Sequence, residues 1–320
     1  MSETPANMVA PLPRWLHIWA VLTVLAALGA MTGGTVVTTL RVGMADPVWP
    51  TYPWHLALIS WDEPSPGFLI EHTHRALAYA AGFCVVVLTI GLWWTRSLPW
   101  LRYTCLIAIV VQGLLGGFRV RLDAWLGSDL KLIHGSFAEV VFALAVSAAV
   151  ATSRSWREPA DLADQQGAES LRRASLLCML AVFGQIVLGG FVRHTNSSLG
   201  QRGHLLVAFL VVATVAWLVH RAVDAPVLEA PLRRAVWCLA GLLALQILLG
   251  VETWMTKFVP GVFPDTQPVT VRQAIIRTAH YVVGSGVFGF AVVTSLRAYR
   301  QALALKTRPV PHLGGLEGAL

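Results

Sequence analysis

The residues best equipped for chemistry in this sequence lie at 68–77, at the start of a long apolar run. Four ionisable side chains occur there: Glu71, His72, His74 and Arg75. On a helix, Glu71 shares one face with His74 and Arg75. His72 points roughly away from that face. An acid, a base or metal ligand, and a cation would therefore share one surface. The simpler interpretation is a surface ion pair at a helix start, where the helix dipole favours the acid.

This apolar run is one of eight that are long enough to span a membrane. The chain has 320 residues, of which 56% are hydrophobic and 13% charged, which excludes an ordinary soluble domain. We expect an all-α, polytopic membrane protein with eight transmembrane helices. The expected spans are residues 13–36, 68–94, 99–119, 128–152, 171–192, 200–221, 231–254 and 270–299.

The basic residues bear on topology rather than on nucleic acid. The net charge is +7, but lysines and arginines cluster in the short connections between spans, as topology selection produces. An even number of spans places both termini on one side, and that side holds more of the basic residues. We therefore expect cytoplasmic termini. Residues 1–13 lack the charged start of a signal peptide, and we expect a multi-pass protein of a bacterial inner membrane.

An internal repeat is the second large pattern. Residues 33–39 align with 189–195, and residues 112–116 align with 246–250. The last four spans therefore look like a copy of the first four. Because each half has an even number of spans, the halves should be related by an axis along the membrane normal. The expected units are an N-terminal repeat at 1–152, a cytoplasmic linker at 153–170, a C-terminal repeat at 171–300 and a cytoplasmic tail at 301–320.

Four histidines recur at equivalent places in this repeat. His74 and His134 begin two spans of the first half, and His204 and His280 lie in the first turns of two spans of the second. All four should lie toward the outer side. Two histidines from neighbouring helices can ligate a porphyrin iron in the core of a bundle. Any one of them alone is more simply a solvated interface residue, but the paired recurrence favours haem ligation.

Haem propionates are anionic, and arginines on the outer side could bind them. Contact with lipid headgroups is the simpler interpretation of any single arginine. The candidates are Arg75, Arg119, Arg121, Arg202, Arg272 and Arg277. His194 aligns with Thr38 and is more simply a polar interface residue than a cofactor contact.

These motifs resemble the haem A synthase family, which converts haem O to haem A for cytochrome c oxidase. The likeness covers nearly the whole chain, and its motifs are Glu-x-x-His-Arg at 71–75, Gln-x-x-Leu-Gly-Gly at 112–117, the His-Gly at His134, and the two second-half histidines. The resemblance implies that His74 and His134 frame the substrate site for haem O. It implies that His204 and His280 ligate a permanent haem b. Haem O synthase and cytochrome oxidase assembly factors are the implied partners, besides membrane lipid.

The resemblance also implies oxidation of a porphyrin methyl group to a formyl group, with oxygen thought to come from water. Glu71, His74 and His134 are the expected catalytic residues. The position three before His204 is Gln201, so among these paired spans only the first half has a carboxylate beside its histidine. An ionised Glu71 would stabilise a cationic carbon or accept a proton from attacking water. Many family members carry a cysteine pair in the first outer loop, whereas residues 40–67 contain no cysteine.

Two other function classes fit part of the pattern. A non-catalytic dihaem cytochrome b that passes electrons from a quinol to a partner needs the four histidines but does not call for Glu71. A transporter or haem exporter with parallel repeats would place ionisable residues near the membrane midplane. The conspicuous ionisable residues here are expected at the outer ends of the spans.

Overall fold

A computed structural model describes residues 12–46, 48–50, 65–157, 165–195, 197–225, 228–258 and 268–306. Its helices are α1 (Arg14–Thr39), α3 (Pro66–Trp94), α4 (Pro99–Arg121), α5 (Asp123–Thr152), α6 (Arg154–Arg157), α7 (Gln165–His194), α8 (Ser198–Asp224), α9 (Ala230–Phe258) and α10 (Val271–Lys306). Eight of these are long and apolar enough to cross a membrane. The predicted all-α architecture with eight candidate spans is confirmed, and within the described part of the chain the one addition is the short helix α6.

Several helices extend beyond the apolar runs that predicted them. Helix α5 begins at Asp123 and α7 at Gln165, in polar sequence that a hydropathy pattern does not register. The start of α3 is set by local chemistry, because the Ser65 hydroxyl accepts a hydrogen bond from the Phe68 N–H and Pro66 opens the first turn. Ser197 caps α8 in the same way, accepting from the Gly200 N–H.

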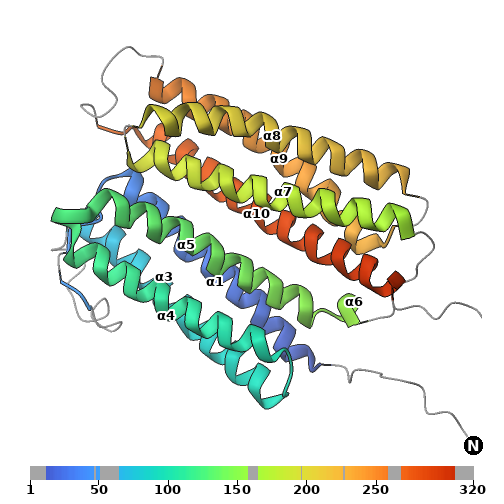
Figure 1. Ribbon diagram of the computed structural model, residues 1–320. Helices are drawn as coiled ribbons and strands as arrows, with labels where there is room; N and C mark the ends of the chain where they lie inside the picture. The colour runs from blue at the N-terminus through green and yellow to red at the C-terminus, as the bar shows by residue number, and fades with distance from the viewer. Residues whose placement is uncertain are drawn as a thin grey trace, which may run out of the picture.

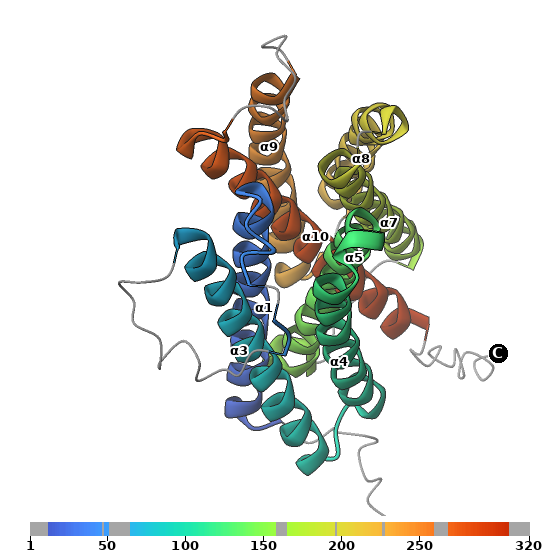
Figure 2. The same ribbon diagram turned by 90° about the vertical axis from the view of Figure 1, so that its left-hand side faces the viewer.

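The long helices form two groups that lie side by side (Figure 1). In one group α1 and α4 each pack on both α3 and α5; in the other α7 and α9 each pack on both α8 and α10. The groups meet through α1, α5, α7 and α10, which face one another in the centre of the end-on view (Figure 2). The same pattern of neighbours in each group agrees with the predicted repeat, which stays a prediction.

Two large buried apolar clusters pack the helices against one another. The larger one crosses the boundary between them and includes Phe142 of α5 and Phe288 of α10. The smaller one packs within the first group, around Leu16, Leu88 and Leu101. Lipid tails are as apolar as these side chains, so close packing rather than escape from water stabilises such contacts. The result is a packed support for the polar ends of the helices.

Helix α1 begins and α10 ends at the same end of the bundle (Figure 1). This agrees with termini on one side. The side itself, cytoplasmic or external, stays a prediction. Of the predicted linker, residues 158–164 lie outside the described residues, and α6 and the first turns of α7 occupy part of the remainder. Residues 1–11, 51–64 and 307–320 also lie outside the described residues. These segments include most of the predicted first outer loop and most of the predicted tail.

Candidate functional site

Each of the four predicted ligand histidines lies against a glycine of a neighbouring helix. A Cβ atom at Gly34 would lie 2.9 Å from Cε1 of His74, and one at Gly116 would lie 3.3 Å from Cε1 of His134. In the second half, a Cβ atom at Gly189 would lie 3.1 Å from Cε1 of His204, and one at Gly250 would lie 3.1 Å from Cε1 of His280. Side chains at these positions would crowd the rings. Glycines of α1, α4, α7 and α9 thus give the imidazoles their space.

Backbone carbonyls orient one histidine in each half. The Nδ1 atom of His74 lies 2.9 Å from the carbonyl oxygen of Ala30, and Nδ1 of His204 lies 3.1 Å from that of Gln185. An Nδ1–H that donates to a carbonyl leaves Nε2 with its lone pair, which is the form that ligates a metal. His74 and His204 are therefore held in equivalent, ligand-ready orientations.

These contacts correct the predicted alignment by one residue. They equate Ala30 with Gln185 and Gly34 with Gly189, whereas the sequence alignment paired Gly33 with Gly189. The Gly-Gly pairs align by identity, but the contacts with histidine decide the structural register. His194 is consequently equivalent to Thr39 rather than to Thr38.

A glutamine accompanies the other histidine of each half. The Nε2 atom of Gln112 lies 3.5 Å from Nε2 of His134, and Nε2 of Gln246 lies 3.5 Å from Nε2 of His280. Gln112 also donates to the carbonyl oxygen of His134 at 3.2 Å. This agrees with the predicted alignment of residues 112–116 with 246–250.

The second-half histidines face each other at a distance that suits a shared metal. The ring centres of His204 and His280 are 6.4 Å apart, and the rings are nearly perpendicular at 84°. With metal–nitrogen bonds of about 2 Å and a ring centre about 1.1 Å from its nitrogen, two ligands on opposite sides of one iron lie roughly 6 Å apart. In the first half, His74 and His134 are close enough for a charge on one to act on the other.

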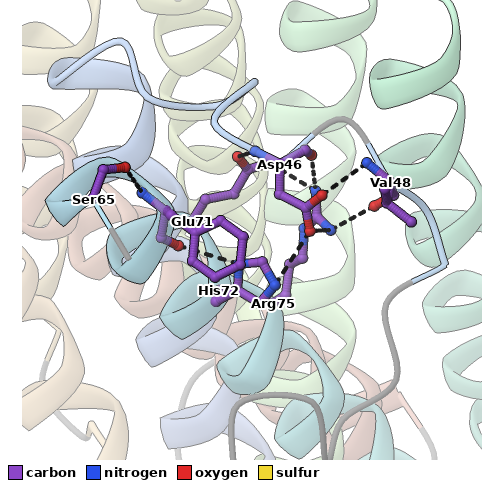
Figure 3. Close-up of polar contacts among 7 residues, drawn as sticks. Asp46, Val48, Ser65, Glu71, His72 and Arg75 are labelled. Atoms are coloured by element: carbon purple, nitrogen blue, oxygen red, sulfur yellow. Dashed lines mark hydrogen bonds and ion pairs between the residues drawn. The ribbon is translucent and has the colours of Figure 1, made fainter. Parts of the chain in front are cut away.

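Glu71 is buried in a polar cluster where the chain leaves α1 and approaches α3 (Figure 3). Its Oε2 accepts the backbone N–H of Asp46 at 2.9 Å, and its Oε1 accepts Nη2 of Arg75 at 2.8 Å. Arg75 also donates to the Asp46 carboxylate at 3.0 Å and to the Val48 carbonyl at 2.7 Å. The predicted ion pair between Glu71 and Arg75 is present, but it is buried and anchors the outer loop.

His72 belongs to the same cluster, on another side of α3 from His74. It stacks on Phe68 with ring centres 3.9 Å apart, and its Nε2 lies 3.2 Å from the Asp46 carboxylate (Figure 3). The sequence analysis did not single out Asp46. Its only signal was an acid in the outer loop, just before the Pro-Val-Trp-Pro segment, and nothing in the spacing connected it to α3.

The first-half arginines mostly contact the backbone of the segment that follows α1. Besides Arg75, the half-buried Arg119 donates through Nη2 to the Gly43 carbonyl at 3.3 Å, and the exposed Arg121 donates to the Trp49 carbonyl at 3.1 Å. All three therefore contact the backbone of residues 43–49. Arg119 faces the interior most, since Glu71 and Asp123 both act on its charge.

The second-half arginines differ in exposure. Arg202 and Arg272 are exposed, and Arg272 forms an ion pair with Glu252. Arg277 is half-buried and lies close enough to Arg193 for their charges to interact. Of the second-half candidates, Arg277 thus lies nearest to the boundary between the groups.

A cluster of cations that the prediction did not assemble surrounds His194. The side chains whose charges act on it come from both halves: Arg193, Lys131, Arg119 and Lys257. They project from the same end of α4, α5, α7 and α9 as the four histidines. Lysine and arginine groups gathered in this way attract carboxylates. The sequence predicted these residues on the outer side but not which way each one points.

Arg193 connects the two halves. Its Nη2 donates to the carbonyl oxygen of Thr35 at 2.6 Å and to the hydroxyl of Thr39 at 2.9 Å, both on α1. Its guanidinium lies 5.6 Å from the centre of the Tyr281 ring of α10. A half-buried cation that contacts α1 and α10 from α7 helps to fix the boundary between the two groups.

Known proteins agree with this arrangement. Residues 52–201 match the family described as cytochrome oxidase assembly protein. The chain is 27% identical over 334 residues to the heme A synthase of Geobacillus kaustophilus, covering 93% of this chain and 94% of that relative. Over nearly its whole length the chain is thus similar to a heme A synthase. It is also 26% identical over 190 residues to the heme A synthase of Shouchella clausii (57% of this chain, 60% of that one) and 24% identical over 277 residues to that of Lysinibacillus sphaericus (76% and 87%).

The match to the family model covers one of the two histidine pairs. Residues 52–201 contain Glu71, His74 and His134 but end before His204. The relative from Geobacillus kaustophilus matches nearly the whole chain. The similarity to this relative therefore extends over both histidine pairs.

Proposed function

We propose that the protein oxidises a methyl group of haem O to the formyl group of haem A, for assembly of cytochrome c oxidase. The observation that carries the proposal is the pair of histidine couples, one in each half, within a chain that is similar over nearly its whole length to a heme A synthase. The oxidation adds one oxygen atom to the methyl carbon. With water as its source, four protons and four electrons are released, and an external electron acceptor takes up the electrons. We propose water as the source of that oxygen.

The second half fits a resident haem b. His204 and His280 would hold its iron, because their rings have the spacing of two ligands on one metal. Gly189 and Gly250 leave the space that the rings need. When bound, haem b supplies one-electron transfer. The carbonyl of Gln185 keeps His204 in its ligand form.

The first half fits the substrate, haem O. His74 and His134 would hold it, again with glycines behind the rings. Glu71 is the asymmetric feature, because its place in the second half is taken by Gln201. The Glu71 carboxylate is fixed by Arg75 and by the N–H of Asp46. A carboxylate held in this way can stabilise positive charge on the reacting carbon or accept a proton from water.

The cations around His194 are suited to the haem propionates. We propose that Arg119 and Arg277, from the sequence prediction, act together with Lys131, Arg193 and Lys257. Their convergence from both halves supports this role. The loop contacts of Arg75 and Arg121 favour anchoring of residues 43–49 instead. The exposure of Arg202 and Arg272 favours lipid headgroups.

The function is tested by co-expressing the protein with a haem O synthase, the proposed supplier of its substrate. Haems are extracted from the purified protein and from the membranes and identified by mass. Accumulation of haem A is the expected result. Haem B alone would instead indicate a non-catalytic dihaem cytochrome b, and a protein without visible absorbance would indicate a transporter.

We further propose that the eight spans lie in a bacterial inner membrane with both termini cytoplasmic. The excess of basic residues on the terminal side supports this orientation. Reporter fusions after α5 and after α10 should both be active only with a cytoplasmic reporter. A periplasmic reporter that is active at either position would reverse the orientation.

A glycine substitution tests the haem b pocket directly. We expect Gly189→Val to weaken haem b binding about 5- to 150-fold and so to lower haem b content, because overpacking against the His204 ring costs roughly 1–3 kcal/mol and about 1.4 kcal/mol is a tenfold change in binding. The measurement is visible absorbance per amount of purified protein. Gly184→Val on the same helix is the matched control, since no described atom beyond its neighbours lies within 4 Å of its Cβ position. Equal haem content in the two variants would contradict the pocket.

A further inference from the structure

A buried carboxyl group lies between the two halves, away from Glu71. Glu139 is 0% exposed and lies near the middle of α5. The hydroxyl of Ser285 on α10 donates to its Oε1 at 2.7 Å, and the phenol of Tyr281 lies close enough to interact with the same carboxyl group. Ionisable residues inside a membrane span are costly, and their retention is a sign of function.

The cluster is placed symmetrically between the two histidine pairs. Glu139 follows His134 by five residues on α5, and Ser285 follows His280 by five residues on α10. The glutamine contacts equate His134 with His280, so Glu139 and Ser285 occupy equivalent positions and hydrogen-bond to each other. Equivalent residues meet only at the axis that relates two copies. Glu139 therefore marks the pseudo-twofold axis of the proposed repeat.

The chemistry at this axis is nevertheless asymmetric. The first half contributes the acid Glu139, and the second half contributes the hydroxyl of Ser285 and the phenol of Tyr281, whose equivalent in the first half is Gly135. Tyr281 directly follows His280, and Arg193 lies over its ring. An apolar pair would be enough for packing alone. A fully buried polar network instead specifies one relative position of the elements it joins.

We propose that Glu139 is a positioning residue for both haem sites. By binding Ser285 and Tyr281 it fixes α10 against α5, and thereby sets the orientation of His280 relative to His134. The inference rests on the proposed function only for its expected effect on haem A formation. Its consequence for the ligand geometry at His280 stands even without turnover.

The test compares Glu139→Leu with Glu139→Gln in the full-length protein. Glutamine keeps an oxygen that accepts from Ser285, and leucine does not. Ser147→Ala is the matched control, because the Ser147 hydroxyl bonds to the Ala143 carbonyl of α5 itself. The first measurement is the low-spin paramagnetic resonance spectrum of haem b in protein purified without haem O. The second is haem A formed per haem b after haem O is supplied.

We expect Glu139→Leu to shift the haem b resonance and to lower haem A formation at least about tenfold, which corresponds to about 1.4 kcal/mol. Glu139→Gln and Ser147→Ala should match the wild type in the resonance and lie within about threefold of its rate. An unshifted resonance in Glu139→Leu would overturn the proposal, and so would a glutamine variant that fails like leucine. A wild type that binds haem b but forms no haem A would refute the proposed function and leave the resonance comparison valid.

If Glu139→Leu does not accumulate, the double variant Tyr281→Phe with Ser285→Ala takes its place. This variant removes the donors and keeps the carboxyl group. It is expected to shift the haem b resonance in the same way. An unchanged resonance in this variant would likewise overturn the positioning role.

Discussion

Replacing His280 with leucine will remove haem b and abolish haem A formation, whereas replacing His134 with leucine will abolish haem A formation and leave haem b bound. The two results differ because His280 faces His204 across the spacing of one iron, while His134 interacts with His74 in the other half. His204 and His280 would hold the iron together, so the loss of His280 would leave it with a single protein bond. We expect haem b content in His280→Leu to fall more than tenfold, equivalent to over 1.4 kcal/mol.

The measurements are haem b per protein and haem A per haem O in extracts of the same membranes. His220→Leu is the control, because His220 is 68% exposed at the opposite end of α8 and pairs only with Asp224 among the described residues. It should retain both haem b and turnover. Loss of haem b in His134→Leu to the same extent as in His280→Leu would show that the halves do not form separate sites.

The fold was largely predictable from the sequence because each span is a long apolar run, and lipid imposes that pattern on every helix. All eight expected spans are present. The errors are at the ends. The first turn of α5, from Asp123, is polar and lies before the apolar run, so hydropathy does not register it as helix. Hydrophobicity marks the part of a helix that crosses lipid, not the part that is hydrogen-bonded.

The histidine positions were predictable for a related reason. A repeat provides two copies of one pattern, so His134 and His280 support each other, and Gln112 and Gln246 fix their alignment. The one-residue slip between α1 and α7 arose because adjacent glycines align equally well by identity. Only a contact such as that of Gly34 with His74 separates the two registers.

The cations and the buried acid were not predictable in the same way. Whether an arginine near a helix end is exposed, as at Arg272, or faces the interior, as at Arg193, depends on helix rotation. The sequence of one helix does not fix that rotation when the helices packed against it are unknown. Glu139 stands alone in an apolar run, and its partner Ser285 is 146 residues away. Long-range polar contacts of this kind become visible only when the helices are placed.

Replacing Glu71 with glutamine will separate its chemical role from its role as an anchor. The variant loses the charge but keeps oxygen and nitrogen atoms at the same place, so the segment at Asp46 can still be held. We expect conversion of haem O to fall about 100-fold or more, which is the usual contribution of a general base or a fixed charge. Haem b content should not change, because His204 and His280 lie in the other half.

The matched control is Asp46→Asn. It weakens the contacts of Asp46 with Arg75 and His72 but leaves its backbone N–H free to bond to Glu71. If Glu71 acts chemically, this variant should lose less than about tenfold, since the loop is perturbed while the carboxylate stays charged. Equal losses in the two variants would mean that Glu71 serves the site by holding the loop. Full conversion by Glu71→Gln would exclude any need for its charge, and the asymmetry between Glu71 and Gln201 would then have to be explained by folding alone.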